Sequence, residues 1–288
     1  MANNIALQTL MASTLDEALV ADVKTRAMEA NANSVKYNGG NKFQYAKISF
    51  GNVDHLDYDR SAGFESGDVT LNYETKEFKK DWGKVFTIDA MDVDETNFIE
   101  TASLVLKEAE RTVFAPAVDK FRFEEFVKLA KANTANGAIV EAYTIAATGV
   151  LKQLRAAFSK AMTGTGLTES DLLCYVSRSF YNALVDDKDV QKVANVAGGQ
   201  VNVNGQVKSV DGVAIEVVDD ERIGKNVHYI VCAKTAPIAI IKHNVSKIIA
   251  PDANPLADGY RVAVRLYHTL EIKDNQYPSV VVGMTTTD

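Results

Sequence analysis

Four histidines and two cysteines are the side chains of this sequence that most often act in catalysis or metal binding. The histidines are widely scattered: His55, His228, His243 and His268. Neither they nor Cys174 and Cys232 show the spacing of a metal site, and no Ser-His-Asp or Cys-His order is recognisable. His268 lies on the apolar face of a strand pattern, which is typical of a core histidine. Both cysteines lie in apolar, strand-like surroundings, which predicts buried free thiols.

Glycine pairs and one acidic triplet match binding motifs only in part. The glycines at 164, 166, 198 and 199 lack the lysine of a phosphate loop and the third glycine of a dinucleotide fingerprint. The aspartates at 89, 92 and 94 lack the glycine and the distal glutamate of a calcium loop, so a helix cap explains them better. We therefore predict no catalytic residue, no cofactor and no metal. A catalytic triad assembled from residues far apart in the chain would show no recognisable order in the sequence. An α/β enzyme is therefore a less favoured alternative.

The longest helical pattern of the chain, at residues 92–132, carries none of this chemistry. Apolar residues recur at steps of three and four from Phe98 to Val113, which predicts an amphipathic helix. Pro116 lacks a backbone donor and clashes with the preceding turn, so this helix should stop or kink near Phe114. A second helix is expected from about 117 to 131. The two helices read as a structural rod.

The other elements predict an extended molecule. Strands at 43–50 and 69–88 flank a polar, acidic stretch and indicate one long hairpin, which has too few apolar residues for a core of its own. Residues 138–162 follow the helical period over six turns. Further predicted elements are a strand at 172–176, a helix at 178–185, a turn-rich meander at 200–218, a strand at 227–233 and a segment at 237–249. A strand at 261–272 would be roughly 40 Å long at about 3.3 Å per residue.

Composition places the chain among ordinary globular proteins. Its 288 residues are 47% hydrophobic and 24% charged. It has no apolar run of about 18 residues and no signal peptide pattern, so we expect a protein that is cytosolic when made. The net charge of −7 argues against a protein that grips phosphate backbones. Residues 51–100 hold thirteen acidic and five basic residues, a net charge of −8, so that one segment carries the acidity.

Short stretches in a fixed order give the sequence a family resemblance. They are residues 84–92 (KVFTIDAMD), 115–123 (APAVDKFRF), 175–181 (YVSRSFY), 210–213 (VDGV), 241–243 (IKH), 251–252 (PD), 257–260 (ADGY) and 265–268 (RLYH). In these stretches the chain resembles the major capsid proteins of tailed bacteriophages, which have the Hong Kong 97-type fold. The resemblance covers about residues 20–283, and none of its motifs has a catalytic logic.

The resemblance implies an α+β fold with four parts. Residues 1–41 would be an N-terminal arm and residues 42–88 the extended loop, a long hairpin that lies over a neighbouring subunit. Residues 89–132 and 237–288 would form the peripheral domain, with a spine helix at 94–114. Residues 133–236 would form the axial domain, which meets its copies at the five- and six-fold axes.

The function implied is that of a structural shell subunit. Copies would assemble as pentamers and hexamers into an icosahedral shell that encloses double-stranded DNA without sequence-specific binding, in the virion, after assembly in the host bacterial cytoplasm. A portal is an implied partner, and no membrane is involved. Since only about thirty residues precede the loop, the resemblance also implies either a separate scaffolding protein or none. An encapsulin-type nanocompartment shell is the nearest alternative. We expect the acidic loop to make intersubunit contacts through its carboxylates: Asp54, Asp57, Asp59, Glu65 and Asp68.

Overall fold

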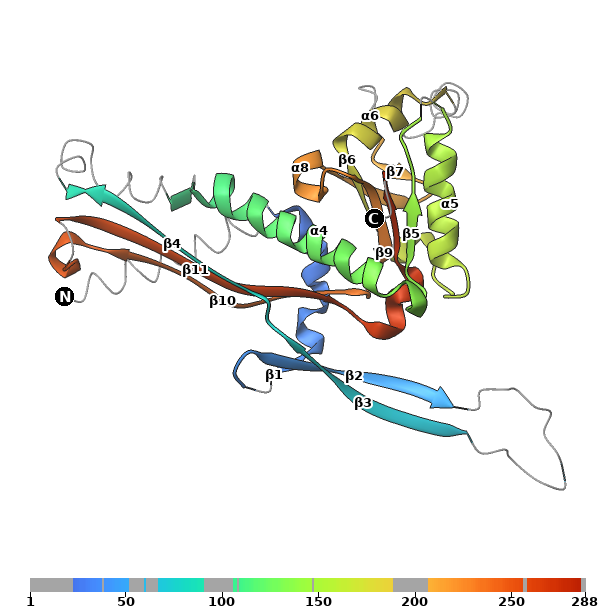
Figure 1. The fold of residues 1–288 in the computed structure, drawn as a ribbon, viewed down its shortest axis with the longest axis horizontal. Helices are drawn as coiled ribbons and strands as arrows, with labels where there is room; N and C mark the ends of the chain where they lie inside the picture. The colour runs from blue at the N-terminus through green and yellow to red at the C-terminus, as the bar shows by residue number, and fades with distance from the viewer. Residues whose placement is uncertain are drawn as a thin grey trace.

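The computed structural model describes residues 23–37, 39–51, 60, 67–90, 106–107, 109–146, 148–188, 207–255 and 258–285. Its described elements form three parts, namely a long limb, a compact body and a projecting hairpin (Figure 1). Five short 3₁₀ segments connect or flank the parts: η1 (Lys24–Ser34), η3 (Thr134–Asn136), η4 (Glu169–Asp171), η5 (Pro251–Ala253) and η6 (Asp274–Ser279).

The limb is a three-stranded antiparallel sheet with one helix laid along it. The strands are β4 (Lys80–Asp89), β10 (Pro237–Ile249) and β11 (Gly259–Ile272), in the order β10-β11-β4. The helix is α4 (Ala115–Ala132), preceded by a π-helical turn, η2 (Glu110–Phe114). The predicted alternation of β11 is confirmed. Its even-numbered residues from 262 to 266 are buried against the helix side of the limb.

The body is a six-stranded mixed sheet between two apolar layers. Its elements are β5 (Ile139–Ala142), α5 (Val150–Met162), β6 (Leu172–Ser177), α6 (Arg178–Asp186), β7 (Ser209–Val210), β8 (Val213–Val218), α8 (Asp220–Ile223), β9 (Val227–Ala233) and β12 (Val281–Met284). The strand order is β5-β12-β9-β6-β8-β7, in which β5–β12 and β6–β8 are parallel. Neighbouring residues alternate between the layers. Cys174 packs with α5 and α6, whereas Tyr175 packs with α4.

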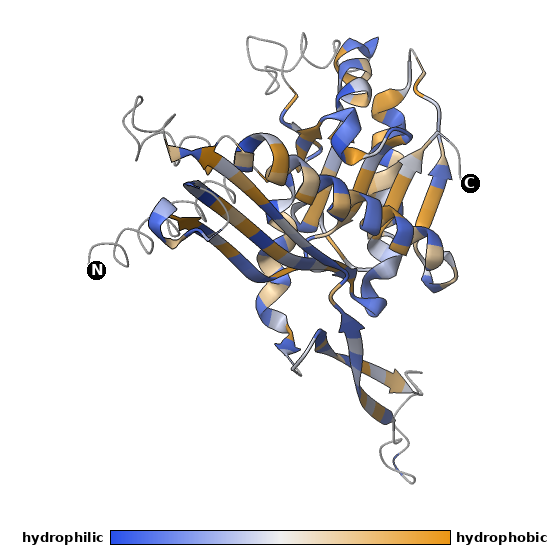
Figure 2. Ribbon diagram, turned by 60° about the vertical axis from the view of Figure 1, so that its left-hand side comes forward, coloured by the Kyte–Doolittle hydropathy of each residue, from blue (hydrophilic) through white to orange (hydrophobic). Residues whose placement is uncertain are grey.

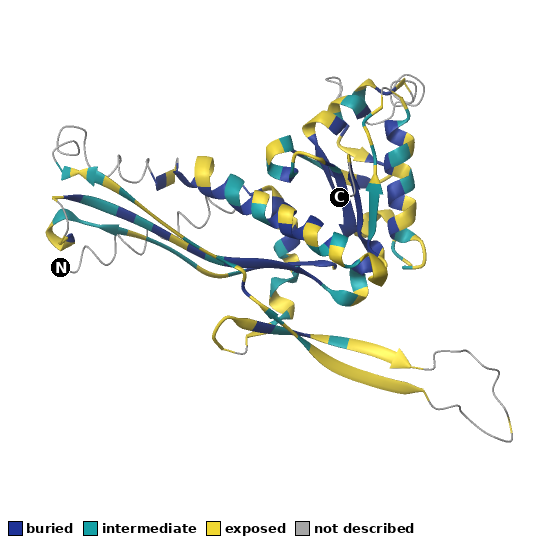
Figure 3. Ribbon diagram, in the orientation of Figure 1, coloured by how far each residue is buried: buried dark blue, intermediate teal, exposed yellow. Residues whose placement is uncertain are grey.

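Buried and apolar residues concentrate in the body, as Figures 2 and 3 show. The strands predicted at 172–176 and 227–233 and the helix predicted at 178–185 are confirmed within one or two residues. The predicted turn between β7 and β8 is also confirmed. Asp211 and Gly212 both have positive φ, 49° and 88°, as a tight two-residue turn requires.

The single helix predicted over residues 138–162 is wrong in its first half. Residues 139–142 form β5, which pairs in parallel with β12, and the helix begins only at Val150, after Gly149 with a φ of 83°. Ile139 and Val140 are β-branched and fit a strand as well as a helix face. Their partner strand lies some 140 residues further along the chain, so local periodicity could not reveal the pairing.

The break predicted at Pro116 is also wrong. Residues on both sides of the proline remain in the right-handed helical region, with Phe114 at φ −78° and ψ −47°. The backbone hydrogen bonds of the helix change their spacing but do not stop. In a π-helical turn just before the proline, the N–H of Ala115 donates to the carbonyl of Glu110. Such a turn inserts one extra residue and rotates the face that follows it. Val113, predicted on the apolar stripe, is consequently 40% exposed, and Phe114 is buried in its place.

The helix predicted at 94–114 lies largely outside the described residues. Within them, Leu106 and Ala109 are buried as the pattern predicted. The second predicted helix, at 117–131, is confirmed as α4. Part of the predicted N-terminal arm packs on its own chain, since Met28 of η1 is fully buried in the core between limb and body. Residues 1–22 lie outside the described residues.

Candidate assembly surfaces

The hairpin consists of β2 (Lys42–Gly51) and β3 (Asp68–Glu77), with the two-residue β1 (Lys36–Tyr37) at its base. It extends away from both limb and body (Figure 1). The sequence pattern placed residues 42–88 in one hairpin. The structure divides that range. The hairpin ends with β3, and the chain then continues into β4, all of whose residues pair with β11 of the limb.

One face of the hairpin is apolar and open to solvent. Directly opposed residues of an antiparallel pair point to the same side, and the register places Ile48 opposite Leu71 and Phe50 opposite Val69. Phe50 and Val69 are each 65% exposed, and Ile48 and Leu71 are about half exposed. Tyr73 extends the row and is 53% exposed. No described element covers this face. The strands that carry it are banded with orange in Figure 2 and are largely yellow in Figure 3.

Beyond the base of the hairpin, where Phe43 and Tyr45 are buried, its opposite face is polar. Ser49 lies opposite Thr70, and Lys47 lies opposite Asn72. A ribbon with one apolar and one polar face has the pattern of a strand pair that rests on another surface. The alternation of residues 69–73 carried this signal in the sequence, but sequence reasoning assigned the contacts to the acidic tip and missed the apolar residues.

The base of the hairpin is fastened to the body through Asp274 of η6. Tyr45 Oη donates to Asp274 Oδ1 over 3.2 Å, and the ammonium groups of Lys47 and Lys76 lie 3.4 and 3.7 Å from the same carboxylate. The neighbouring Asn275 donates to the carbonyl of Ile48. These contacts join both strands of the hairpin to one short segment and so fix the direction in which it projects.

A second fastening lies where the hairpin passes into β4. Lys79 Nζ is 2.7 Å from Glu125 of α4 and 2.5 Å from Glu271 of β11, and both carboxylates are nearly buried. Burial on its own lowers the pKa of Lys79, but the hydrogen bonds to the two glutamates outweigh it and the pKa is raised. The lysine therefore stays charged at neutral pH and ties the hairpin to both layers of the limb.

The carboxylates predicted to make intersubunit contacts lie mostly beyond what the structure describes. Asp54, Asp57, Asp59 and Glu65 are outside the described residues. Asp68 is described and is exposed at the first position of β3, opposite Gly51.

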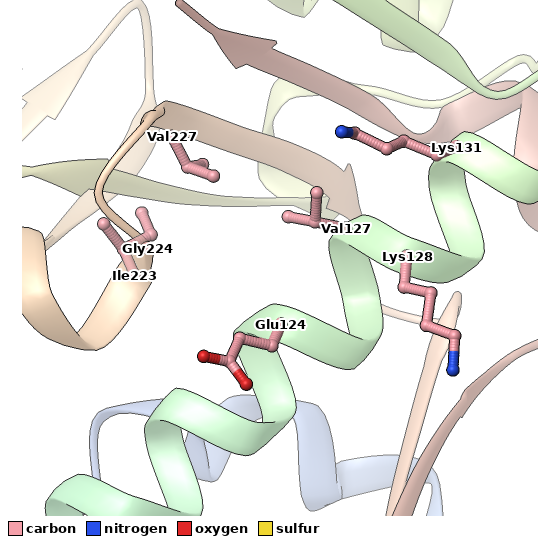
Figure 4. Close-up of a pocket in the computed structure, with 7 residues that line it drawn as sticks. All are labelled: Glu124, Val127, Lys128, Lys131, Ile223, Gly224 and Val227. Atoms are coloured by element: carbon pink, nitrogen blue, oxygen red, sulfur yellow. The ribbon is translucent and has the colours of Figure 1, made fainter. Parts of the chain in front are cut away.

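A shallow groove between α4 and α8 has a volume of about 310 Å³ (Figure 4). Its floor is apolar, with Val127, Ile223 and Val227, and the side chains of Glu124, Lys128 and Lys131 stand around it. Lys128 pairs with Glu125 rather than with a group in the groove. The groove therefore brings together no nucleophile, base and oxyanion donor that could perform chemistry.

The predicted core positions of histidine and cysteine are confirmed. His268 is fully buried between the rings of Trp82 and Phe121, whose centroids lie 4.8 and 4.9 Å from its own. Neither of its ring nitrogens has a hydrogen-bond partner among the described residues. Burial, together with nearby Arg122 and Lys80, lowers the pKa of His268 to about 3.

Both cysteines are buried and free. Burial raises the pKa of their thiols, that of Cys232 to about 12, so neither provides a thiolate nucleophile at neutral pH. Among the described residues, no three His, Cys, Asp or Glu side chains come together as metal ligands. In the same part of the chain, no helix has the length and apolar character needed to cross a bilayer.

No protein-family model and no curated protein matches the sequence. Solved structures do match. The capsid of the cyanophage P-SCSP1u has a TM-score of 0.63 at 14% identity and covers 86% of this chain and 84% of its own. The mature capsid of bacteriophage PhiM1 has a TM-score of 0.61 at 13% identity, with 86% and 82% covered. The virus-like particle from Pyrococcus furiosus has a TM-score of 0.57 at 12% identity, with 95% and 97% covered.

These matches extend over most of the chain rather than over one element, because more than four fifths of each chain is aligned. At 12–14% identity they concern the fold, and they agree with the fold that the sequence motifs indicated. The chain has the α+β Hong Kong 97-type capsid fold.

Proposed function

We propose that this chain is the structural subunit of a closed shell, the major capsid protein of a tailed bacteriophage, with no catalytic role. Because a fold alone does not determine function, the proposal needs an observation from the molecule itself. That observation is the apolar face of the hairpin, which projects from the body and which none of the described elements covers.

The physical argument is one of missing partners. A two-stranded ribbon is marginally stable in water, and large exposed apolar patches mark interaction surfaces. The contacts of Asp274 and Lys79 hold the base of this ribbon in a defined direction, so the apolar face is presented in advance of binding. A second copy of the chain, placed by symmetry, would cover it, and repetition of that contact would close a shell.

The three parts of the structure suggest a division of labour. The limb would be the peripheral domain, and the body, including β12, would be the axial domain around the five- and six-fold axes of pentamers and hexamers. The β2–β3 hairpin would be the extended loop. The pairing of β12 with β5 and β9 supports its place in the axial domain.

The contents and partners of the shell follow from the same proposal. The shell would enclose double-stranded DNA without sequence-specific contacts. The net charge of −7 agrees with this, because a negatively charged protein attracts phosphates only weakly. A scaffolding protein and a portal would take part in assembly in the host cytoplasm, and the finished protein would reside in the virion.

A nanocompartment shell with protein cargo is the second candidate. The observation in its favour is the likeness to the virus-like particle from Pyrococcus furiosus, which spans 95% of this chain and 97% of the other. The contents of the particle separate the two functions, since one would hold nucleic acid and the other a cargo protein.

Expression of the full chain, alone and with a scaffolding protein encoded beside it, tests the proposal. We expect closed, uniform particles by negative-stain microscopy, with this chain as the main component by mass. A monodisperse monomer that stays unassembled at high concentration in both experiments would contradict it.

A further inference from the structure

The described chain crosses between limb and body in segments that lie close together. These crossings are residues 133–138, 234–236 and 273–280. The side-chain amide of Asn133 donates to the hydroxyl of Tyr277 over 3.0 Å, and the N–H of Lys273 donates to the carbonyl of Ala236 over 3.0 Å. We call the three crossings the pivot. Because they are gathered at one place, contacts away from the pivot must fix the angle between limb and body.

The segment η1 lies across this junction. It contacts α4 and β10 of the limb, and in Figure 1 it is the blue coil that crosses α4. The side-chain amide of Asn31 donates to the carbonyls of Lys234 and Pro237 over 2.8 and 2.9 Å. These carbonyls lie where the chain passes from β9 of the body into β10 of the limb. We name residues 24–31 the strap.

The other end of the strap holds limb and body at once. The N–H groups of Lys24 and Thr25 donate to the carboxylate of Asp119 in α4 over 3.0 and 3.1 Å, and the Thr25 hydroxyl adds a bond of 2.8 Å. The ammonium group of Lys24 lies 2.8 Å from Glu216 of β8 in the body. Arg222 of α8, also in the body, lies 3.4 Å from Asp119. One cluster therefore joins strap, limb and body.

The middle of the strap is held by a buried arginine. Arg122 of α4 is fully buried, donates to the Thr25 hydroxyl over 2.9 Å and lies 2.6 Å from the carboxylate of Glu29. Asp119 and Thr25 are fully buried as well. Because buried charges are costly unless each keeps its partners, such a cluster admits few arrangements. Apolar packing is non-directional, so it fixes an angle less sharply.

Distance from the pivot gives the strap its leverage. Asp119 and Asn133 are separated along α4 by roughly 21 Å, at about 1.5 Å per residue. A displacement of about 2 Å at that distance is a rotation of about 5°. Contacts at Asp119 therefore restrict the angle between limb and body more closely than contacts at the pivot itself.

We infer that the strap sets the angle between limb and body, and that this angle selects the diameter of the closed particle. The inference rests on the proposed shell function and specifies which contacts within one subunit give the shell its curvature. Symmetric copies close only if the rotation between them fits a closed arrangement. An angular change repeated in every subunit therefore alters the size at which the shell closes, or leaves it open.

A charge reversal with a compensating partner tests the strap in the full chain. Lys24→Glu places a carboxylate beside Glu216, and Glu216→Lys in the same chain restores an opposite pair. Both side chains are about half exposed, so the subunit should stay folded. Asn31→Ala removes the bonds at the other end of the strap. The matched control is Arg155→Glu, which breaks an ion pair of similar exposure with Asp211 inside the body.

Two measurements are made on each variant. Spin labels at Val113→Cys in the limb and Lys152→Cys in the body report the limb–body distance by double electron–electron resonance, with labelled chain diluted by excess unlabelled chain. Both positions are exposed, whereas Cys174 and Cys232 are buried and should stay unlabelled. Negative-stain microscopy gives the distribution of particle diameters.

We expect Lys24→Glu and Asn31→Ala each to at least double the width of the limb–body distance distribution. Each should also at least halve the share of particles that have the main diameter of the unaltered protein. Glu216→Lys combined with Lys24→Glu should restore both quantities, and Arg155→Glu should change neither.

An unchanged distance distribution in both strap variants, or an equal change in the Arg155→Glu control, would overturn the inference. A changed distance distribution with an unchanged, uniform diameter would overturn the link between angle and particle size. Failure of the unaltered chain to form particles would contradict the proposed function instead, and the distance measurement would still decide whether the strap sets the angle.

Discussion

Replacement of two hairpin residues by threonine should weaken assembly without unfolding the subunit. Phe50→Thr and Leu71→Thr remove apolar surface from the open face, where the two side chains are 65% and 53% exposed. Threonine retains a strand preference, so the hairpin should form as before. Exposed substitutions of this kind change the free energy of unfolding by within about 0.5 kcal/mol.

The size of the effect follows from what remains to be buried. Full burial of a leucine or phenylalanine contributes about 1.5–3 kcal/mol, so the exposed half of each contributes roughly 1 kcal/mol or more on docking. Together the two changes should cost about 2–3 kcal/mol per contact. Since 1.4 kcal/mol corresponds to about a tenfold change in affinity, each contact weakens at least about thirtyfold.

Static light scattering against protein concentration measures the threshold at which particles appear. We expect that threshold to rise at least about tenfold in the double variant, a margin below the loss per contact worked out above. Ser49→Thr with Asn72→Thr is the matched control, because it introduces the same residue twice on the polar face. An unchanged threshold, or an equal shift in the control, would refute the view that the apolar face mediates assembly.

Three further substitutions probe the fold that presents these surfaces. Asp119→Ala should lower the free energy of unfolding by about 3–5 kcal/mol, because the fully buried Asp119 accepts hydrogen bonds from both the N–H and the hydroxyl of Thr25. Denaturant unfolding measures this change, and an unchanged midpoint would contradict it. His268→Phe should reduce the loss of thermal stability that occurs as the pH falls into the acid range. With a pKa near 3 in the fold and 6.5 as its ordinary value, the wild type loses stability as pH falls through that window, by at most about 1.4 kcal/mol per pH unit, and equal slopes would refute the assignment. Gly283→Ala should cost about 1–3 kcal/mol in a calorimetric scan, because the added Cβ would overlap the Tyr229 ring, and a stability equal to that of Gly51→Ala would contradict the packing.

Elements whose signals are local could be predicted from the sequence. The strand at 227–233 and the helix at 178–185 lie between turn residues and have one clear period, and the structure reproduces both. The family motifs indicated a capsid fold, and the comparisons confirm that fold.

Predictions that depended on distant partners failed. Residues 139–142 became a strand because β12 and its own neighbour β9 complete a sheet there.

At Pro116 the local rule was sound, since proline does remove a backbone hydrogen-bond donor. A π-helical turn accommodates that loss within a continuous helical path, and hydropathy patterns carry no signal for such a turn.

The candidate surfaces were predicted only in outline. Net charge drew attention to the tip of the hairpin, whereas the alternation from Val69 to Tyr73 already marked one side as apolar. That this side is open rather than covered depends on the direction of the whole hairpin. Contacts to Asp274, about 200 residues further along the chain, fix that direction, so periodicity alone could not supply it.

Electron cryomicroscopy of the purified assembly, expressed with its scaffolding protein, tests the central claim most directly. We predict a closed icosahedral shell in which each subunit has the limb, body and hairpin described above. The apolar face of each hairpin should be covered by a neighbouring copy. A dispersed monomer under these conditions, or a shell in which every hairpin remains uncovered, would contradict the account.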